Sequence, residues 1–533
     1  MQWTDRSLVH VALPVVVLVV AINFVTMPAE EYPGDANALR AETVTLLNTG
    51  KWAIPADIAP DYGPRGQYLY QNAKGNWYPK YGVLNTLIYL PPLWLEKIAT
   101  GDLVINSTTR VWFLNLLNVA LSGASALYLI LLARRYTRRR PACPPRWERQ
   151  SNGSIAIISI FVLASIYSTF WWNYLRVQTF ETYQTWFMLA FYYHFVSALD
   201  SDQAGCDERK RKLLVAAIYF GALVLSKTVY VALLPAIAAI LLADNFSIAP
   251  DPHQALRVRL SLRERIRAIA TRRREVRAQL LFFWVPVALF LGVLAITNWY
   301  KFDSPFATGY TQWEKESQLF RVTNVLPALG GFLFSGQHSV FLHFPLLVFA
   351  LAGWPMFFKK HKLDALAAAV FAFALLLVSS MFINWRGESS YGPRYLLPIL
   401  PIVSLPFISY LEWLTKLSNK IARSFLAAGT AVLLAYSTLL QVGFNTLPFF
   451  FCYDLKEILD DKRNSKPALY LRSHYFGTIS RNFLLYKFGY PSPLNEKVVH
   501  HLNLAETEKM YTLTESVRAN YYWFPNAFGR VDQ

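Results

Sequence analysis

The stretch MPAEEYPGDANALR (Met27–Arg40) opens a polar segment that closes with GNWYPKYGVLNTLIYLPPLWLEKI (Gly75–Ile98). The whole segment, Met27–Thr108, follows the first hydrophobic run of the chain and precedes the second. It carries a carboxylate, Asp35, and a cation, Lys80. A loop that holds such groups against a bilayer is suited to chemistry on a substrate whose tail stays in the lipid.

The chain on either side of this segment is typical of a membrane protein. It is 54% hydrophobic and 16% aromatic. Apolar runs of about 20 residues recur, which is long enough to cross a hydrocarbon core of roughly 30 Å, and most lack the polar face of a soluble amphipathic helix. We therefore predict an all-α polytopic membrane protein, a bundle of about 11 transmembrane helices with interfacial helices in the first outer loop.

The predicted spans are Leu8–Val25, Val111–Ala133, Ile155–Trp172, Tyr183–Leu199, Leu213–Ser226, Val229–Leu242, Leu280–Asn298, Val340–Phe358, Leu363–Ile383, Tyr395–Leu414 and Phe425–Gly443. The fifth and sixth are short and are joined at Lys227–Thr228, so they form either two helices or one kinked unit. Residues 1–443 are expected to form the membrane-embedded domain, and residues 444–533 an extracytoplasmic carboxy-terminal segment.

The distribution of basic residues predicts the orientation of the bundle. With the amino terminus in the cytoplasm, five loops face inward, and together with Arg6 they carry about half of the 52 Lys and Arg residues. This is the positive-inside pattern of the cell (inner or plasma) membrane. The formal charge of +18 is therefore interpreted as a topology signal and as contact with membrane lipids, rather than as binding to nucleic acid. The inward loops are Arg134–Asn152, Asp200–Lys212, Ala243–Gln279, Lys359–Lys362 and Thr415–Arg423.

Two further segments have an ambiguous pattern. Val83–Ile98 is apolar enough to span, but counting it would place Arg134–Arg140 outside, so we expect a helix in the outer interface, broken at Pro91 and Pro92. Leu256–Gln279 has apolar residues at helical spacing among many arginines, which indicates an amphipathic helix on the inner leaflet. A solvated linker is the alternative for that segment.

Asp35 follows a glycine just after the first span, where two roles are open. A carboxylate there can act as a general base that takes the proton of a hydroxyl nucleophile. Asp35 also precedes ANALRAETVTLLNTG, so it can cap the amino terminus of a helix. The two roles do not exclude each other.

Four cations lie at the outer ends of predicted spans: Lys80, Lys227, Arg386 and Arg394. If several converge, they can bind a phosphate and stabilise negative charge on a leaving oxygen. The alternative for a single Lys is that its side chain only reaches to the interface. Arg394 is the stronger candidate, because it stands in a glycine-rich turn directly before a span.

The other candidate residues are also on the outer side. Glu181 and Glu388 are possible second acids or ligands of sugar hydroxyls, and Trp385 is either a stacking platform or an interface residue. His338 and His343 lack an acidic or cysteine partner nearby in sequence, so no metal site is predicted. No cofactor is predicted; a divalent metal is conceivable but nothing in the sequence supports it. The substrate-contacting candidates are Arg40, Glu181, His338, Trp385 and Glu388.

Several of these segments, in this order, resemble the GT-C superfamily of integral-membrane glycosyltransferases, including the protein O-mannosyltransferases and the aminoarabinose transferases. The resemblance covers about residues 8–443. The matching segments are Gly34-Asp35 followed by Arg40, LLNTG (Leu46–Gly50), YPKYG (Tyr78–Gly82), NWYKFDSPFATGY (Asn298–Tyr310), GFLFSGQHSVFLHFP (Gly331–Pro345) and YGPRYLLPILP (Tyr391–Pro401).

The resemblance implies transfer of a sugar from a polyprenyl-phosphate donor to an envelope lipid, glycan or protein on the extracytoplasmic face, with inversion. It implies that Asp35 is the base, that Lys80 occupies the basic position of a Lys-Pro or His-Pro motif, and that Arg394, with Lys80 or Lys227, binds the donor phosphate. His338 stands where many relatives have arginine. A transporter or flippase of lipid-linked sugars is the alternative function, and a scaffold without chemistry a third.

Overall fold

The computed structural model describes residues 6–28, 35–59, 68–101, 103, 112–137, 152–199, 206–247, 273–312, 319–335, 338–387 and 392–446. These residues are mainly helical, with one two-stranded sheet. Four of the described helices are long and apolar enough to cross a membrane: Phe113–Thr137, Val276–Phe302, Lys362–Met381 and Lys420–Val442. Shorter apolar helices accompany them. The all-α polytopic class is therefore confirmed, while the predicted total of about 11 spans stays a prediction.

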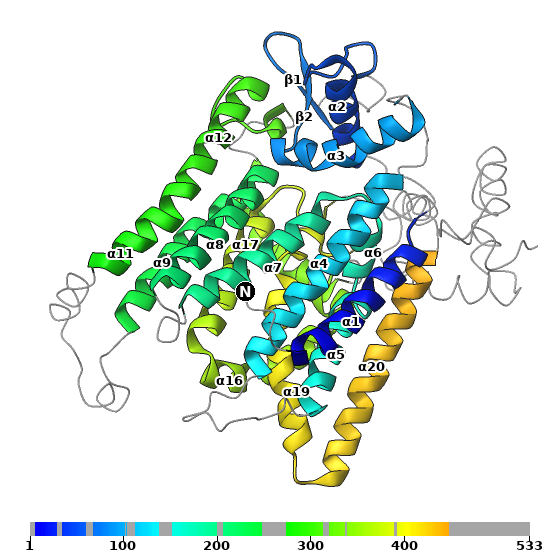
Figure 1. Ribbon diagram of the computed structural model, residues 1–533, viewed down its shortest axis with the longest axis vertical. Coiled ribbons are helices and arrows are strands. Elements are labelled where there is room, and N and C mark those ends of the chain that lie inside the picture. Colours follow the sequence, from blue (N-terminus) through cyan, green and yellow to red (C-terminus); the bar gives the residue numbers. More distant parts are fainter. Residues whose placement is uncertain are drawn as a thin grey trace, which may run out of the picture.

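Most of the described chain packs as one bundle of helices (Figure 1). Its longer members are α1 (Arg6–Val25), α4 (Trp112–Thr137), α5 (Asn152–Tyr167), α7 (Phe180–Leu199), α8 (Cys206–Ser226), α9 (Leu234–Ser247), α12 (Val285–Phe302), α16 (Leu346–Lys360), α17 (Lys362–Met381), α19 (Pro406–Lys416) and α20 (Lys420–Thr446). The shorter ones are α6 (Trp171–Arg176), η2 (Thr228–Leu233), α11 (Arg273–Gln279), η3 (Leu280–Trp284), η4 (Gly309–Gln312), η5 (Val322–Asn324), α14 (Val325–Phe334), α15 (Val340–His343), η6 (Arg394–Leu396) and α18 (Leu400–Val403).

Several predicted spans are interrupted in the structure. Ile155–Trp172 is not one helix, because α5 ends at Tyr167 and α6 begins separately. Val340–Phe358 is divided into α15 and α16 before Pro345, and Tyr395–Leu414 is divided into η6, α18 and α19. Proline lacks a backbone N–H and favours such interruptions. Helix α14 was not predicted, since it is much shorter than a membrane span.

The fifth and sixth predicted spans are two helices. Helix α8 ends at Ser226, and Lys227 has an extended backbone with φ −155° and ψ 121°. The chain then continues as the 3₁₀ helix η2 and as α9. The extended residue turns the Lys227 side chain away from either helix axis and into the space between elements.

The described residues of the segment Met27–Thr108 form a small cap at one end of the bundle, which we name the cap end (Figure 1). It contains α2 (Asp35–Thr49), the antiparallel strands β1 (Leu69–Gln71) and β2 (Trp77–Pro79), and α3 (Val83–Thr100). Helix α3 lies across the bundle and is not among the helices fit to span a membrane, in agreement with an interfacial placement.

The predicted break in α3 is wrong. Pro91 and Pro92 lie inside one continuous helix. The fixed φ of proline is compatible with helical geometry, and each missing N–H affects only the carbonyl four residues earlier. One of those carbonyls belongs to Leu87, which is exposed, so water or lipid headgroups can reach it.

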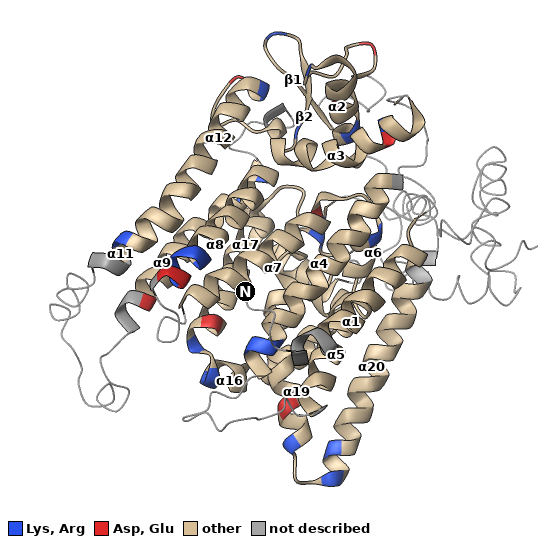
Figure 2. Cartoon of the chain, in the orientation of Figure 1, with Lys and Arg blue, Asp and Glu red and all other residues tan. Residues whose placement is uncertain are grey.

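Basic residues gather at the end of the bundle opposite the cap, notably near α16, α19 and α20 (Figure 2). This grouping follows the charge pattern of the sequence, but which end faces the cytoplasm stays a prediction. Of the expected amphipathic helix, the structure describes only α11, which continues through the π-helical turn η3 into α12. The predicted carboxy-terminal segment lies outside the described residues beyond Thr446.

Candidate functional site

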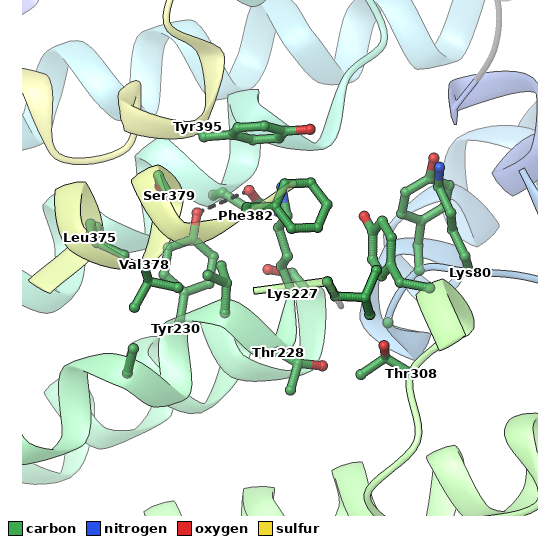
Figure 3. Close-up of a pocket in the computed structure, with 18 of the residues that line it drawn as sticks. Lys80, Lys227, Thr228, Tyr230, Thr308, Leu375, Val378, Ser379, Phe382 and Tyr395 are labelled. Carbon is green, nitrogen blue, oxygen red and sulfur yellow. Dashed lines mark hydrogen bonds between the residues drawn. The ribbon is translucent and has the colours of Figure 1, made fainter. Parts of the chain in front are cut away.

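A cavity of about 430 Å³ lies beside the cap, between the start of α3, α7, the α8–η2 link, α12 and α17. Charged and polar residues line one part of it: Lys80, Tyr81, Glu181, Gln184, Lys227, Tyr310, Arg394 and Tyr395. Apolar residues line much of the rest: Val229, Ala232, Phe302, Leu375, Val378, Met381, Phe382 and Pro398. The cavity therefore has a charged part and an apolar part (Figure 3).

Three cations of the sequence analysis meet here. The Lys80 ammonium lies 5.1 Å from the ring centre of Tyr310, and the Lys227 ammonium lies 4.3 Å from that of Tyr395. Arg394 stacks near the same Tyr395 ring at 5.1 Å. Aromatic faces stabilise cations without neutralising them, so these ring contacts leave the three positive charges in place.

Two carboxylates complete the cluster. Arg394 Nη2 lies 3.5 Å from Asp35 Oδ2, and Arg394 Nε lies 3.8 Å from Glu181 Oε1. The Tyr81 hydroxyl donates a hydrogen bond to Asp35 Oδ1. The Arg394 distances are longer than the 2.7–2.9 Å typical of tight charged hydrogen bonds, so the arginine sits between the carboxylates without closing on either.

The electrostatics of the cluster follow from this arrangement. Burial raises the pKa of the Asp35 carboxyl, but Lys80, Arg394 and the Tyr81 hydrogen bond outweigh it and hold the pKa below its ordinary value. Burial lowers the pKa of Lys227, in the link outside the spanning helices, to about 8; Glu181 opposes that shift and Arg394 adds to it. Asp35 is therefore ionised at neutral pH, and Lys227 is close to losing its proton.

Asp35 lies both at the start of a helix and in the cation cluster. It is the first residue of α2, where a carboxylate is favoured by the helix dipole. Its oxygens nevertheless face Tyr81 and Arg394, so the side chain belongs to the cation cluster as well. The structure thus places Asp35 at the start of α2 and within the cation cluster, and its role as a base stays a prediction.

A close approach of two segments positions Lys80. A Cβ atom on Gly309 would lie 2.1 Å from Lys80 Cα and 2.5 Å from its Cβ. Only glycine therefore lets the segment after α12 pack against the Lys80 backbone. This explains why the motif that ends in ATGY meets the motif YPKYG.

A second close approach positions Lys227. A Cβ atom on Gly82 would lie 2.0 Å from the carbonyl oxygen of Leu225. Next to it, Asn85 Nδ2 donates to the carbonyl of Ser226 at 2.9 Å, and Tyr183 donates to Asn85 Oδ1 at 2.6 Å. Helix α3 thus fixes the end of α8 from which Lys227 extends.

The other predicted substrate contacts do not line the cavity within the part of the chain that the structure describes. Arg40 is buried on α2, where its charge acts on Glu96. His338 packs edge-on against Trp385 with ring centres 5.9 Å apart, and the Trp385 ring packs against α14 at Gly331 and Phe332. Arg386 is exposed beside Trp385. Glu388 lies outside the described residues.

The sequence analysis missed several polar residues of the cavity. Tyr81, Tyr310 and Tyr395 lie within the quoted motifs and adjoin the predicted cations, so their position was a usable signal. Gln184 and Tyr230 had no such signal, since both lie within predicted membrane spans and outside the quoted motifs. Among the described residues, no three His, Cys, Asp or Glu side chains gather as a metal site.

The fold and the cavity define an integral membrane protein with a buried cationic pocket that continues into an apolar one. This chemistry suits a lipid that carries an anionic phosphate. No protein-family model and no curated protein sequence matches the chain.

Solved structures of two membrane enzymes are similar in fold to this chain. The first is ArnT from Cupriavidus metallidurans bound to undecaprenyl phosphate, with 13% identity over 93% of this chain and 81% of that chain and a TM-score of 0.44. The second is the archaeal oligosaccharyltransferase AglB from Archaeoglobus fulgidus, in complex with an inhibitory peptide and a dolichol-phosphate. It is 12% identical over 96% of this chain, with a TM-score of 0.46, and the match spans only 60% of that enzyme.

Proposed function

We propose that the protein is a GT-C-type glycosyltransferase of the cell membrane. It transfers a sugar from a polyprenyl-phosphate donor to a hydroxyl of an envelope lipid, glycan or protein on the extracytoplasmic face. The observation that supports this most is the division of the cavity, in which Lys80, Lys227 and Arg394 face one part and apolar side chains line the other.

The cations supply what a phosphate leaving group requires. As the bond between the sugar and the phosphate breaks, negative charge grows on the departing phosphate oxygen. Fixed positive charges in a site with little water stabilise that charge more than water would. The apolar wall holds the polyprenyl chain, so the lipid product need not leave the membrane.

Asp35 supplies the base. The acceptor oxygen forms a bond to the anomeric carbon from the face opposite the phosphate, which inverts that carbon. The bond to the phosphate oxygen breaks, and its electron pair leaves with the polyprenyl phosphate. The acceptor proton passes to the Asp35 carboxylate, which is ionised and oriented by Tyr81.

The test is turnover of labelled polyprenyl-phosphate sugars by the purified protein with a panel of acceptors. Asp35→Asn is expected to lower turnover by about 10²- to 10⁴-fold, the usual contribution of a general base, while donor binding remains. Asp57→Asn is the matched control, since Asp57 is an exposed carboxylate of the same segment. Full activity in Asp35→Asn would remove the base.

The same preparation tests the transporter alternative. If reconstituted vesicles move the lipid-linked sugar across the bilayer and no donor is ever consumed with any acceptor, the protein is a flippase. Consumption of donor with release of polyprenyl phosphate supports the transferase.

A further inference from the structure

Two buried side chains on α7 face the cavity with unused hydrogen-bonding capacity. Glu181 and Gln184 are one helical turn apart, and their exposed fractions are 2% and 1%. Within the described residues, neither Glu181 oxygen accepts a hydrogen bond, and Gln184 Nε2 donates none. Gln184 Oε1 is occupied, because Tyr230 donates to it at 3.0 Å (Figure 3).

Such groups are costly to bury unless a ligand completes them. A buried polar atom without a partner typically costs about 1–3 kcal/mol, and both side chains line the cavity. Glu181 requires donors, and Gln184 Nε2 requires an acceptor. A sugar hydroxyl offers a donor and an acceptor in one group, so neighbouring hydroxyls of a sugar satisfy both side chains.

The charges of the cavity restrict the ligand further. Lys80, Lys227 and Arg394 lie with the two carboxylates Asp35 and Glu181, so these five groups carry a net charge of +1 when all are ionised. A buried site is stabilised when its charges are balanced. A phosphate diester brings one negative charge and balances the site. A diphosphate linkage or a sugar acid brings one too many, and an amino sugar restores the positive excess.

We infer that Glu181 and Gln184 form a subsite for sugar hydroxyls, and that the site takes an uncharged sugar on a single phosphate diester. This inference rests on the proposed function and names its donor class. Because Arg394 Nε lies 3.8 Å from Glu181, the phosphate ligand and the sugar ligand are adjacent, as they are in such a donor.

The test compares the affinities of matched lipids, measured by competition with a fluorescent polyprenyl phosphate in detergent. The probes are a polyprenyl-phosphate neutral hexose, the matching amino sugar, the diphosphate-linked hexose, and polyprenyl methyl phosphate, which has the same charge but no sugar. The neutral hexose diester is expected to bind best, about tenfold tighter than the methyl diester. Glu181→Gln and Gln184→Leu are expected to abolish that difference.

A charge variant tests the balance. Gln184→Glu keeps an acceptor for Tyr230 and adds one negative charge, so the ratio of amino-sugar to neutral-sugar affinity is expected to rise by about tenfold. Gln71→Glu, in strand β1 outside the cavity lining, is the control and should leave the ratio unchanged. Equal binding of the hexose and methyl diesters by the unaltered protein, or a preference for the charged donors, would overturn the inference.

The two proposals fail separately. Donor turnover combined with equal binding of the sugar-bearing and sugarless diesters leaves the transferase standing and removes the subsite. The expected binding order without any donor consumption supports the subsite and removes the transferase.

Discussion

The ion pairs at the end of the bundle away from the cap and the cation cluster of the cavity use buried charge in opposite ways. At the end away from the cap, Arg209 Nη2 lies 2.7 Å from Asp244, and Arg135 Nη2 lies 3.0 Å from Asp364. At the cap end, Arg394 stands 3.5 and 3.8 Å from its two carboxylates, and two lysines lie nearby. The cap end also has one closed pair, Lys301 Nζ with Glu42 Oε1 at 2.6 Å. Its cavity cluster, in contrast, is open and carries one more positive than negative charge when all five groups are ionised.

This difference separates structural charges from charges that await a ligand. A closed pair compensates its own desolvation and joins two helices, here α8 to α9 and α4 to α17. The open cluster around the cavity has a net positive charge that an entering anion can balance. The comparison therefore predicts that the first kind controls stability, while the second controls binding at little or no cost in stability.

The largest expected effect breaks a closed pair. Arg209→Met takes the ion partner of Asp244 away, and removal of one member of a buried pair typically costs about 3–5 kcal/mol. We expect a strongly lowered melting temperature in detergent with donor affinity unchanged per folded molecule. The double variant Arg209→Met with Asp244→Leu removes both charges and should recover most of the loss. A stable single variant would show that the pair is not structural.

The open cluster should respond in the reverse manner. Lys227→Met leaves equal numbers of positive and negative groups in the cluster. The free energy of unfolding should therefore fall by no more than about 1 kcal/mol, or rise, and the melting temperature should follow it. Donor affinity should fall about 100-fold, as is typical when a charged hydrogen bond to a phosphate is lost. Both quantities come from one thermal-shift titration with donor. Lower stability together with unchanged affinity would contradict the distinction.

The sequence identified some residues of the cation cluster and missed others, because only some of them have a recognisable position in the chain. Asp35, Lys80 and Arg394 each directly follow a glycine or a proline near one end of an apolar run. The sequence therefore indicated that they lie beside a membrane face. The sequence did not indicate toward which side of its helix each side chain points. Arg40 follows Asp35 by five residues, which turns it roughly 140° around α2, and it lies buried outside the cavity lining.

Contacts between segments far apart in the chain could not be predicted from the sequence either. Trp385 and His338 pack on each other near α14, a helix too short for a hydropathy window to detect. Gln184 lines the cavity from α7, and the Tyr230 hydroxyl that donates to its oxygen comes from η2, far away in the sequence. Charge counting separated α3 from the predicted spans, in agreement with the structure, whereas its continuity through Pro91 and Pro92 was not predictable.

The cluster should also show a pH dependence that a closed pair lacks. Lys227 has a pKa of about 8 because burial lowers it, and a bound phosphate diester raises that pKa again. Donor affinity should therefore be constant below pH 8 and then fall by at most about tenfold per pH unit. The diester itself does not titrate in this range, so Lys227→Met should give a flat profile.

The stability of the protein without donor should rise with pH over the range in which donor affinity falls. Above pH 8 the folded protein releases the Lys227 proton, whereas the unfolded chain keeps it until its ordinary pKa of 10.5. The unfolded state then binds more protons, so this group adds stability as pH rises through that window. The difference in melting temperature between the protein and Lys227→Met isolates the contribution. A difference that does not change with pH would show that burial does not lower the pKa of Lys227.

The smallest expected effect concerns how the cap delivers Lys80 to the cluster. Gly309→Ala places a methyl group where Lys80 Cα now lies 2.1 Å away, so the two segments must separate. Such crowding typically costs about 1–3 kcal/mol, and the displaced lysine should raise the KM for the donor severalfold. Gly292→Ala in α12 is the matched control, because nothing lies within 4 Å of its added atom, and it should be neutral or stabilising. If Gly309→Ala binds donor normally, the phosphate contact does not depend on where the cap holds Lys80, and the cations of Lys227 and Arg394 suffice.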